Sequence, residues 1–207
     1  MSKLTSISQA RGIARLGFDD ESSLSLRLKD VKRLGLSEGM CFEPERLRAE
    51  ICRAQLDDAY EAALTRLDYA ARSEREISQA LLRKGYLPEV CEAVVERLRD
   101  ARLLNDQELA QRLSSAMEAG GRGKYAIQRK LRQRGISDAA SEEALEELSE
   151  EAQDASALKA ARQLVRKYAA LDSRQAKNKL SQALSRRGFS WDSISYALER
   201  ISFSQED

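Results

Sequence analysis

The sequence predicts a mainly α-helical protein, in which three tandem three-helix repeats form an elongated, curved array behind a small N-terminal cap that contains a β-hairpin. Three observations predict this fold. Alanine and leucine, both strong helix formers, supply 57 of the 207 residues. Only 10 glycines and 2 prolines interrupt the chain. A short motif of basic residues, glycine and an apolar residue recurs three times, as expected for stacked helical repeats.

Residues 1–43 form the predicted cap. Leucines alternate with polar residues between Ser22 and Leu28, which places the leucines on one face of a strand. This strand is expected to form a hairpin with residues 13–18, and a short helix is expected at residues 29–34. Because so small a sheet needs a surface to pack on, its leucine face should rest on the helices that follow.

Helical spacing begins at Pro44, a residue that suits the first turn of a helix because an N–H group is not needed there. Residues 44–101 are predicted to hold this leading helix and the first repeat. Within them, Ser73 and Glu76 have the spacing of a capping box, in which each side chain accepts a hydrogen bond from the other residue's backbone N–H.

The repeat is marked by Gly85, Gly135 and Gly188, which lie 50 and 53 residues apart. Basic residues precede each glycine and an apolar residue follows it, as at a helix end with glycine in the left-handed conformation. Helices are predicted before these turns at residues 57–71, 105–119 and 155–170, and after them from Pro88, Ser137 and Ser190. Residues 102–151 and 152–207 are therefore the predicted second and third repeats.

The near-neutral net charge of +1 conceals three strongly charged segments. Residues 121–135 hold six basic and no acidic residues, residues 136–156 hold eight acidic and no basic ones, and residues 157–189 hold nine basic residues against one acidic. Charge segregated in this way indicates a binding surface for a charged partner.

A helical wheel of the first basic segment places Tyr125, Arg129 and Arg132 opposite the apolar Ile127 and Leu131. An exposed tyrosine between arginines suits phosphates and stacked bases, or an acidic protein groove. In the second basic segment Lys179 and Arg186 likewise share a flank away from the leucines. The candidate binding residues are Arg122, Lys124, Tyr125, Arg129, Lys130, Arg132, Lys177, Lys179, Arg186 and Arg187.

The acidic segment is expected to form one helix over residues 141–151 whose carboxylates are solvated or paired with neighbouring basic helices, because ligands lined along one helix do not converge on a metal. The glycine-rich stretch 120–124 lacks the P-loop pattern: Glu118 stands at the position of the first glycine and Tyr125 at that of the Ser or Thr. We expect a flexible connection there.

The composition argues against an enzyme. No histidine is present, and the three cysteines form no C-x-x-C pair, so we expect buried cysteines, no disulfide, no metal and no cofactor. The chain shows neither a signal peptide nor a membrane span, and is expected to be soluble and cytoplasmic.

Motifs over residues 57–203 resemble, in order and spacing, those of the RecX family. The matching residues are Ser73, Glu76, Ile77, Leu81, Lys84–Tyr86, Leu104–Asp106, Leu109, Ala110, Gly123, Ile127, Leu131, Gly135, Ile136, Leu184, Arg186–Phe189 and Ile194. The resemblance implies a cytoplasmic, non-enzymatic regulator that binds the RecA–DNA filament, inhibits the recombinase, and so regulates DNA repair, homologous recombination and the SOS response. It also implies single- or double-stranded DNA as part of the target, and we expect a monomer with no membrane partner.

Two alternatives remain open at the level of sequence. The protein could bind DNA directly, without a recombinase, or act as a protein-only adaptor. In the second repeat, docking like that of a helix-turn-helix module is excluded, because the helix after the glycine turn is strongly acidic.

Overall fold

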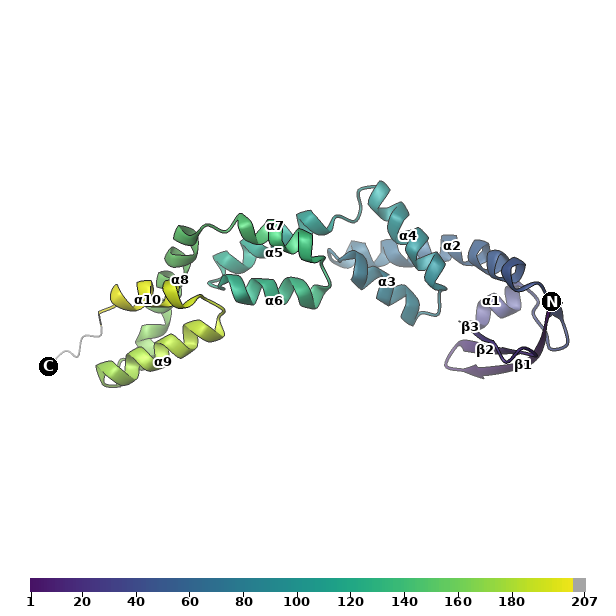
Figure 1. Cartoon of the computed structure of the whole chain (residues 1–207), viewed down its shortest axis with the longest axis horizontal. Coiled ribbons are helices and arrows are strands. Elements are labelled where there is room, and N and C mark those ends of the chain that lie inside the picture. The colour runs from purple at the N-terminus through teal and green to yellow at the C-terminus, as the bar shows by residue number, and fades with distance from the viewer. Residues whose placement is uncertain (203–207) are drawn as a thin grey trace. The chain divides into compact units, whose positions relative to one another are not determined.

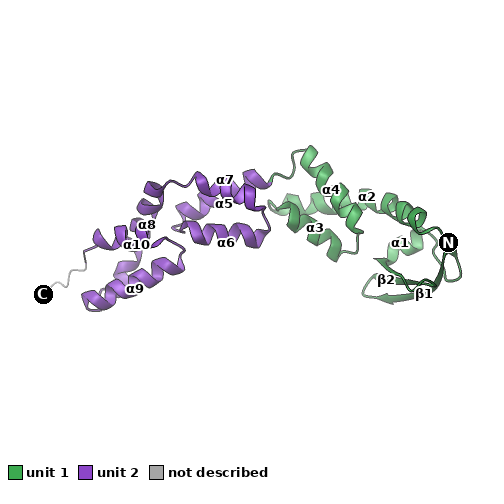
Figure 2. Cartoon of the chain, viewed as in Figure 1, with its two compact units in different colours: residues 1–105 green, residues 106–207 purple. Residues whose placement is uncertain are grey.

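The computed structural model describes residues 1–202, and contacts divide the chain into two compact units, Met1–Asn105 and Asp106–Asp207 (Figure 2). Unit 1 begins with a four-stranded antiparallel sheet of order β3-β2-β1-β4. The bounds of its strands and first helix are β1 Ser2–Ala10, β2 Ile13–Phe18, β3 Ser23–Arg27, α1 Leu28–Arg33 and β4 Cys41–Phe42. The sequence predicts four segments, 1–43, 44–101, 102–151 and 152–207. These boundaries are finer than the two units and stay a prediction.

The predicted hairpin is confirmed as β2 and β3, with Leu16 facing Leu24 in the register. The structure adds β1 and β4, which the sequence analysis did not predict. The residues of β1 are mostly polar and lack apolar alternation, and the strand is stabilised by pairing with β2, as where Ile7 faces Leu16. Leu16 and Leu26 are fully buried in one cluster with Ile51 of the following helix, so the sheet packs on the helices as expected.

Three helices complete unit 1: α2 Pro44–Tyr69, α3 Glu74–Arg83 and α4 Pro88–Asp100. The separate leading helix and the segment 57–71 prove to be one continuous helix of 26 residues, because no glycine or proline after Pro44 interrupts it. The capping box of Ser73 and Glu76 is confirmed, with both reciprocal hydrogen bonds present at the start of α3.

A buried polar network connects the sheet to the first repeat. The fully buried carboxylate of Asp30 accepts hydrogen bonds from Arg27 Nε at 2.7 Å and from Gln55 Nε2 at 2.6 Å. The Arg27 guanidinium also lies 4.0 Å from the ring centroid of Tyr86, whose hydroxyl donates to the backbone oxygen of Asp58. Burial raises the pKa of Tyr86, whereas the hydrogen bond from Lys29 lowers the pKa of Asp58.

The expectation that all three cysteines are buried is wrong for one of them. Cys41 lies exposed on β4, at the edge of the sheet, while Cys52 is half-buried and Cys91 buried on α4. All three are free thiols. Burial raises the pKa of the Cys91 thiol to about 11.

Unit 2 contains the second and third repeats (Figure 1). Each repeat has its own apolar core. Its helices are α5 Asp106–Ala119, α6 Lys124–Arg134, α7 Asp138–Glu146, α8 Glu150–Val165, the 3-10 helix η1 Arg166–Tyr168, α9 Ser173–Arg186 and α10 Trp191–Glu199. Ser137 and Ser190 cap α7 and α10, as predicted, and Gly85, Gly135 and Gly188 all have positive φ.

The predicted acidic helix over residues 141–151 is wrong in its extent. The helix α7 ends at Glu146, and α8 begins at Glu150, five residues before the predicted start at residue 155. The Ser149 hydroxyl accepts a hydrogen bond from the Ala152 N–H and so starts a new helix inside the acidic segment.

Candidate nucleic-acid interface

The basic helix α6 has the predicted amphipathic arrangement. Ile127 and Leu131 are fully buried in the core of the second repeat. Arg129 and Arg132 are exposed, and the Tyr125 side chain between them on the wheel is 60% exposed. On α9, Lys179 and Arg186 are exposed while Leu180 and Leu184 are buried, again as predicted. Because the apolar faces of α6 and α9 are buried, the cations on the opposite faces of both helices point to solvent.

A direct backbone contact joins the two basic helices. The N–H of Gly123 donates to the Arg187 carbonyl at 2.9 Å, and the N–H of Tyr125 donates to the Gly188 carbonyl at 3.0 Å. In Figure 1 the turn after α9 lies against one end of α6. A Cβ at Gly123 would lie 2.3 Å from the Gly188 oxygen, and one at Gly188 would lie 2.3 Å from the Ala126 nitrogen. Only glycine at both positions permits this approach, which we call the glycine junction.

Side chains of α5 and α8 hold the same segment. The Gln153 side chain accepts from the Lys124 N–H at 2.8 Å and donates to the Glu118 carboxylate at 2.7 Å. The Ser156 hydroxyl donates to the Glu118 carbonyl at 3.1 Å. The expectation of a flexible connection at residues 120–124 is therefore wrong, since Gly121 and Gly123 are buried and the segment is bonded to three helices.

These contacts also exclude a phosphate loop at the start of α6. A P-loop offers free backbone N–H groups to phosphate oxygens. Here the N–H groups of Gly123, Lys124 and Tyr125 all donate to oxygens of the protein itself. Phosphates would therefore have to be bound by the side chains around the glycine junction.

The structure gathers half of the predicted binding residues at this junction. Those on the segments that form it are Arg122, Lys124, Tyr125, Arg186 and Arg187. The Arg187 guanidinium lies 3.5 Å from the position of a Cβ on Gly121, so it reaches across to the α5–α6 connection. Lys179 lies two turns, about 10 Å, before Arg186 on α9.

The other predicted residues are not all part of this surface. Arg129 and Arg132 extend it along α6. Lys130 lies about 140° around α6 from Tyr125, and Lys177 lies about 180° around α9 from Arg186, so both side chains leave their helices on other sides. Both are exposed.

The acidic helix α7 packs against α5 and α6, and α5 supplies hydrogen bonds to its carboxylates. Glu143 and Glu147 accept hydrogen bonds from the amides of Gln107 and Gln111 on α5, each at 2.8 Å. These two carboxylates thus lie at the surface of the second repeat. The packing of α7 against α5 fixes where the acidic face of this repeat lies.

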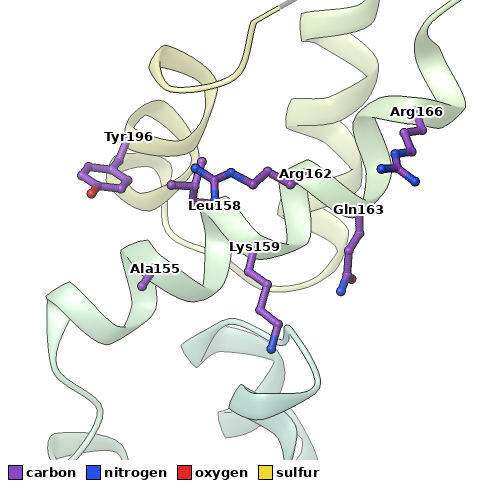
Figure 3. A pocket seen from close by; sticks show the side chains of 7 residues that line it. All are labelled: Ala155, Leu158, Lys159, Arg162, Gln163, Arg166 and Tyr196. Carbon is purple, nitrogen blue, oxygen red and sulfur yellow. The ribbon is translucent and has the colours of Figure 1, made fainter.

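A second basic surface, on α8 and the first residue of η1, was not predicted from the sequence. Lys159, Arg162 and Arg166 have the spacing i, i+3, i+7 and line an open hollow of about 650 Å³ together with Tyr196 of α10. Figure 3 shows the Arg162 side chain extending from α8 toward Tyr196. The Arg200 guanidinium lies 3.7 Å from the centroid of the Tyr196 ring. The basic segment 157–189 contains these cations. Their position at one hollow with Tyr196 depends on the packing of α8 against α10.

Trp191 is a further residue that sequence analysis missed. It is the only tryptophan in the chain, it opens α10 three residues after Gly188, and its side chain is 70% exposed. Its place directly after a repeat turn was the available signal. An exposed indole three residues after Gly188 adds an aromatic side chain to the segment that follows the junction.

Two other kinds of feature, a metal site and a membrane-spanning helix, concern residues 1–202 as a whole. Nowhere in that range do three or more cysteine, aspartate or glutamate side chains gather as metal ligands would. Among the same residues, every helix is too short or too polar to cross a membrane.

Comparisons with known proteins identify all three repeats. Models of the RecX first, second and third three-helix domains match residues 59–98, 105–145 and 151–198. The regulatory protein RecX of Bacillus velezensis is 31% identical over 194 residues, which are 91% of this chain and 72% of that protein. That of Bacillus subtilis is 34% identical over 154 residues, which are 74% of this chain but only 58% of that protein.

Solved structures support the same assignment. A crystal structure of regulatory protein RecX aligns with a TM-score of 0.67 at 24% identity, covering 97% of this chain and all of that one. RecX from Lactobacillus salivarius aligns with a TM-score of 0.66 at 26% identity, covering 71% of this chain and 96% of that one. The first of these likenesses concerns the fold alone.

Proposed function

The chain belongs to the RecX family of regulatory proteins, and from this premise we propose that it binds the filament that the bacterial RecA recombinase forms on DNA and inhibits recombinase activity. Because the proposed partner is a bacterial recombinase, we place the action of this protein in the cytoplasm. By limiting the growth of the filament, the protein would restrain both recombinational repair and the SOS response. The protein acts by binding, without catalysis of its own.

The observation that carries this proposal is the basic surface of unit 2. Cations from the second and third repeats meet at the glycine junction, and three more line the hollow on α8. A nucleoprotein filament presents closely spaced phosphates beside protein, so a rigid surface with several cations suits it. Surface cations contribute most when several phosphates are bound together, because each contact releases counterions.

The acidic helix α7 limits how DNA can approach. Its carboxylates repel phosphates, so DNA should lie along the surface of α6 and α9 rather than across α7. In this arrangement unit 2 supplies the DNA contact, and acidic α7 is free to contact basic protein surface. One molecule could then contact DNA and recombinase at the same time.

The test is the ATP hydrolysis rate of the cognate RecA on single-stranded DNA as this protein is added. We expect the rate to fall with increasing protein. Inhibition at substoichiometric ratios indicates capping of growing filament ends, and inhibition only near one molecule per recombinase subunit indicates coating of the filament. An unchanged rate across the titration contradicts the proposal.

Direct DNA binding without a recombinase is the second candidate, favoured by the same basic surface. A gel-shift titration on naked single-stranded and duplex DNA separates the two. Tight binding to naked DNA together with an unchanged recombinase ATPase would favour this second function. For a protein-only adaptor, reversing the charge of the α6 cations would leave DNA affinity untouched and abolish binding to the protein partner.

A further inference from the structure

Two aromatic side chains stand out on the surface of unit 2. In the described part of that unit, Tyr125 and Trp191 are the large hydrophobic side chains that remain exposed, at 60% and 70%. Neighbouring apolar residues such as Phe189 and Ile194 are buried. An exposed indole retains apolar surface that a partner can cover, which favours a binding role.

The glycine junction brings together the backbone segments that carry the two rings. The Tyr125 N–H donates to the Gly188 carbonyl, and Trp191 follows Gly188 by three residues. Three residues span at most about 11 Å, so the backbones that carry the two rings lie within a short distance. Trp191 begins a helix capped by Ser190, which fixes its backbone. The two rings therefore project from a rigid support.

The charges around this support select the kind of partner. Arg122, Lys124, Arg186 and Arg187 lie on the segments that meet at the junction, and the nearest carboxylate along the chain from Trp191 is its neighbour Asp192. Cations interspersed with exposed aromatic rings are the combination that binds single-stranded nucleic acid, where phosphates pair with cations and unpaired bases stack on rings. In a duplex the base faces are covered by their neighbours in the stack.

We propose that Tyr125 and Trp191 form a stacking platform for the unpaired bases of single-stranded nucleic acid, with the junction cations binding its phosphates. This rests on the proposed function and sharpens it, because it names the form of DNA that the basic surface contacts. It predicts a preference for single strand over duplex in the isolated protein. The platform needs both repeats, since one ring comes from each.

The only tryptophan of the chain reports directly on this site. We expect oligothymidylate added to the intact protein, without recombinase, to quench Trp191 fluorescence to saturation, and added salt to reverse the quenching. A duplex of equal length should bind at least several-fold more weakly. Tyr125→Ala should weaken single-strand affinity by about 5- to 150-fold, the range for loss of one stacked base.

Matched variants separate stacking from folding. Trp191→Phe, followed by a labelled oligonucleotide, should retain most of the affinity, while Trp191→Ala should lose as much as Tyr125→Ala. Tyr69→Ala removes an exposed tyrosine of unit 1 and should change nothing. Circular dichroism checks that each variant keeps its helix content.

Three outcomes would overturn the platform. They are absent quenching, equal affinity for duplex and single strand, and full affinity in both alanine variants. Quenching by polyglutamate but not by oligothymidylate would assign the surface to an acidic protein. None of these results depends on recombinase ATPase, so the proposed function can stand if the platform fails, and the reverse.

Discussion

Substituting Gly123 by alanine should loosen the contact between the second and third repeats without straining the backbone. Gly123 has φ −82°, a conformation that alanine adopts readily, so the substitution acts only through the added methyl group. That Cβ would lie 2.3 Å from the Gly188 oxygen and 2.4 Å from the Phe189 nitrogen. Both are backbone atoms, so no flexible side chain can move aside.

The expected cost follows from how the structure can respond. If the start of α6 moves off the turn, the two backbone hydrogen bonds donated by Gly123 and Tyr125 are lost, at about 1 kcal/mol each. If it stays, overpacking costs about 1–3 kcal/mol. We therefore expect a loss of about 2 kcal/mol in local stability. This corresponds to an equilibrium constant for local opening that is about 30-fold larger.

Amide hydrogen exchange read by mass spectrometry measures this loss in each unit separately. Peptides from α6 and α9 should exchange about 30-fold faster in Gly123→Ala, while peptides from α2 to α4 should be unchanged. Gly120→Ala is the matched control in the same connection, because its Cβ would lie 3.3 Å from the nearest atom, the Met117 oxygen, against 2.3 Å at Gly123. Wild-type exchange of α6 in Gly123→Ala would refute the assignment of this glycine to close packing.

Three further predictions concern the interface, the network and the thiols. Reversing Arg129 and Arg132 to Glu should weaken binding to recombinase filaments and lower the slope of log K against log salt by about one per lost phosphate contact; an unchanged low-salt titration would remove these residues from the interface. Asp30→Asn leaves the buried Arg27 without its main partner. Urea unfolding should show that unit 1 is destabilised by about 3 kcal/mol, the lower end for a broken buried pair. A change in unfolding free energy below about 1 kcal/mol would mean that the network is dispensable. A maleimide should label the exposed Cys41 rapidly at neutral pH, whereas Cys91, buried and with a thiol pKa of about 11, should react only after unfolding; rapid labelling of Cys91 would contradict its packing.

Local signals in the sequence were enough to predict the repeats. The capping box at Ser73 and the glycines at 85, 135 and 188 each act within one helix end, through hydrogen bonds and φ values that depend on a few adjacent residues. The buried faces of α6 and α9 followed from helical periodicity in the same way. These features need no knowledge of distant residues.

Errors arose where long-range contacts or competing local signals decide. The strand β1 is polar, and its conformation is set by pairing with β2. The first half of α2 belongs to the same helix as the second because nothing in between ends it. In the acidic segment, Ser149 competes with continued helical spacing and prevails, so that α7 stops and α8 starts.

The candidate site divides along the same line. The helices that carry cations, and the side of each helix that faces water, could be predicted from sequence alone, because charge and periodicity are properties of single segments. The packing of helices far apart in the chain sets the backbones of Tyr125 and Trp191 on one support and places Arg162 and Tyr196 at one hollow. The physical reason is the approach of two backbones at Gly123 and Gly188, where the absence of side-chain atoms allows hydrogen bonds between residues more than sixty positions apart.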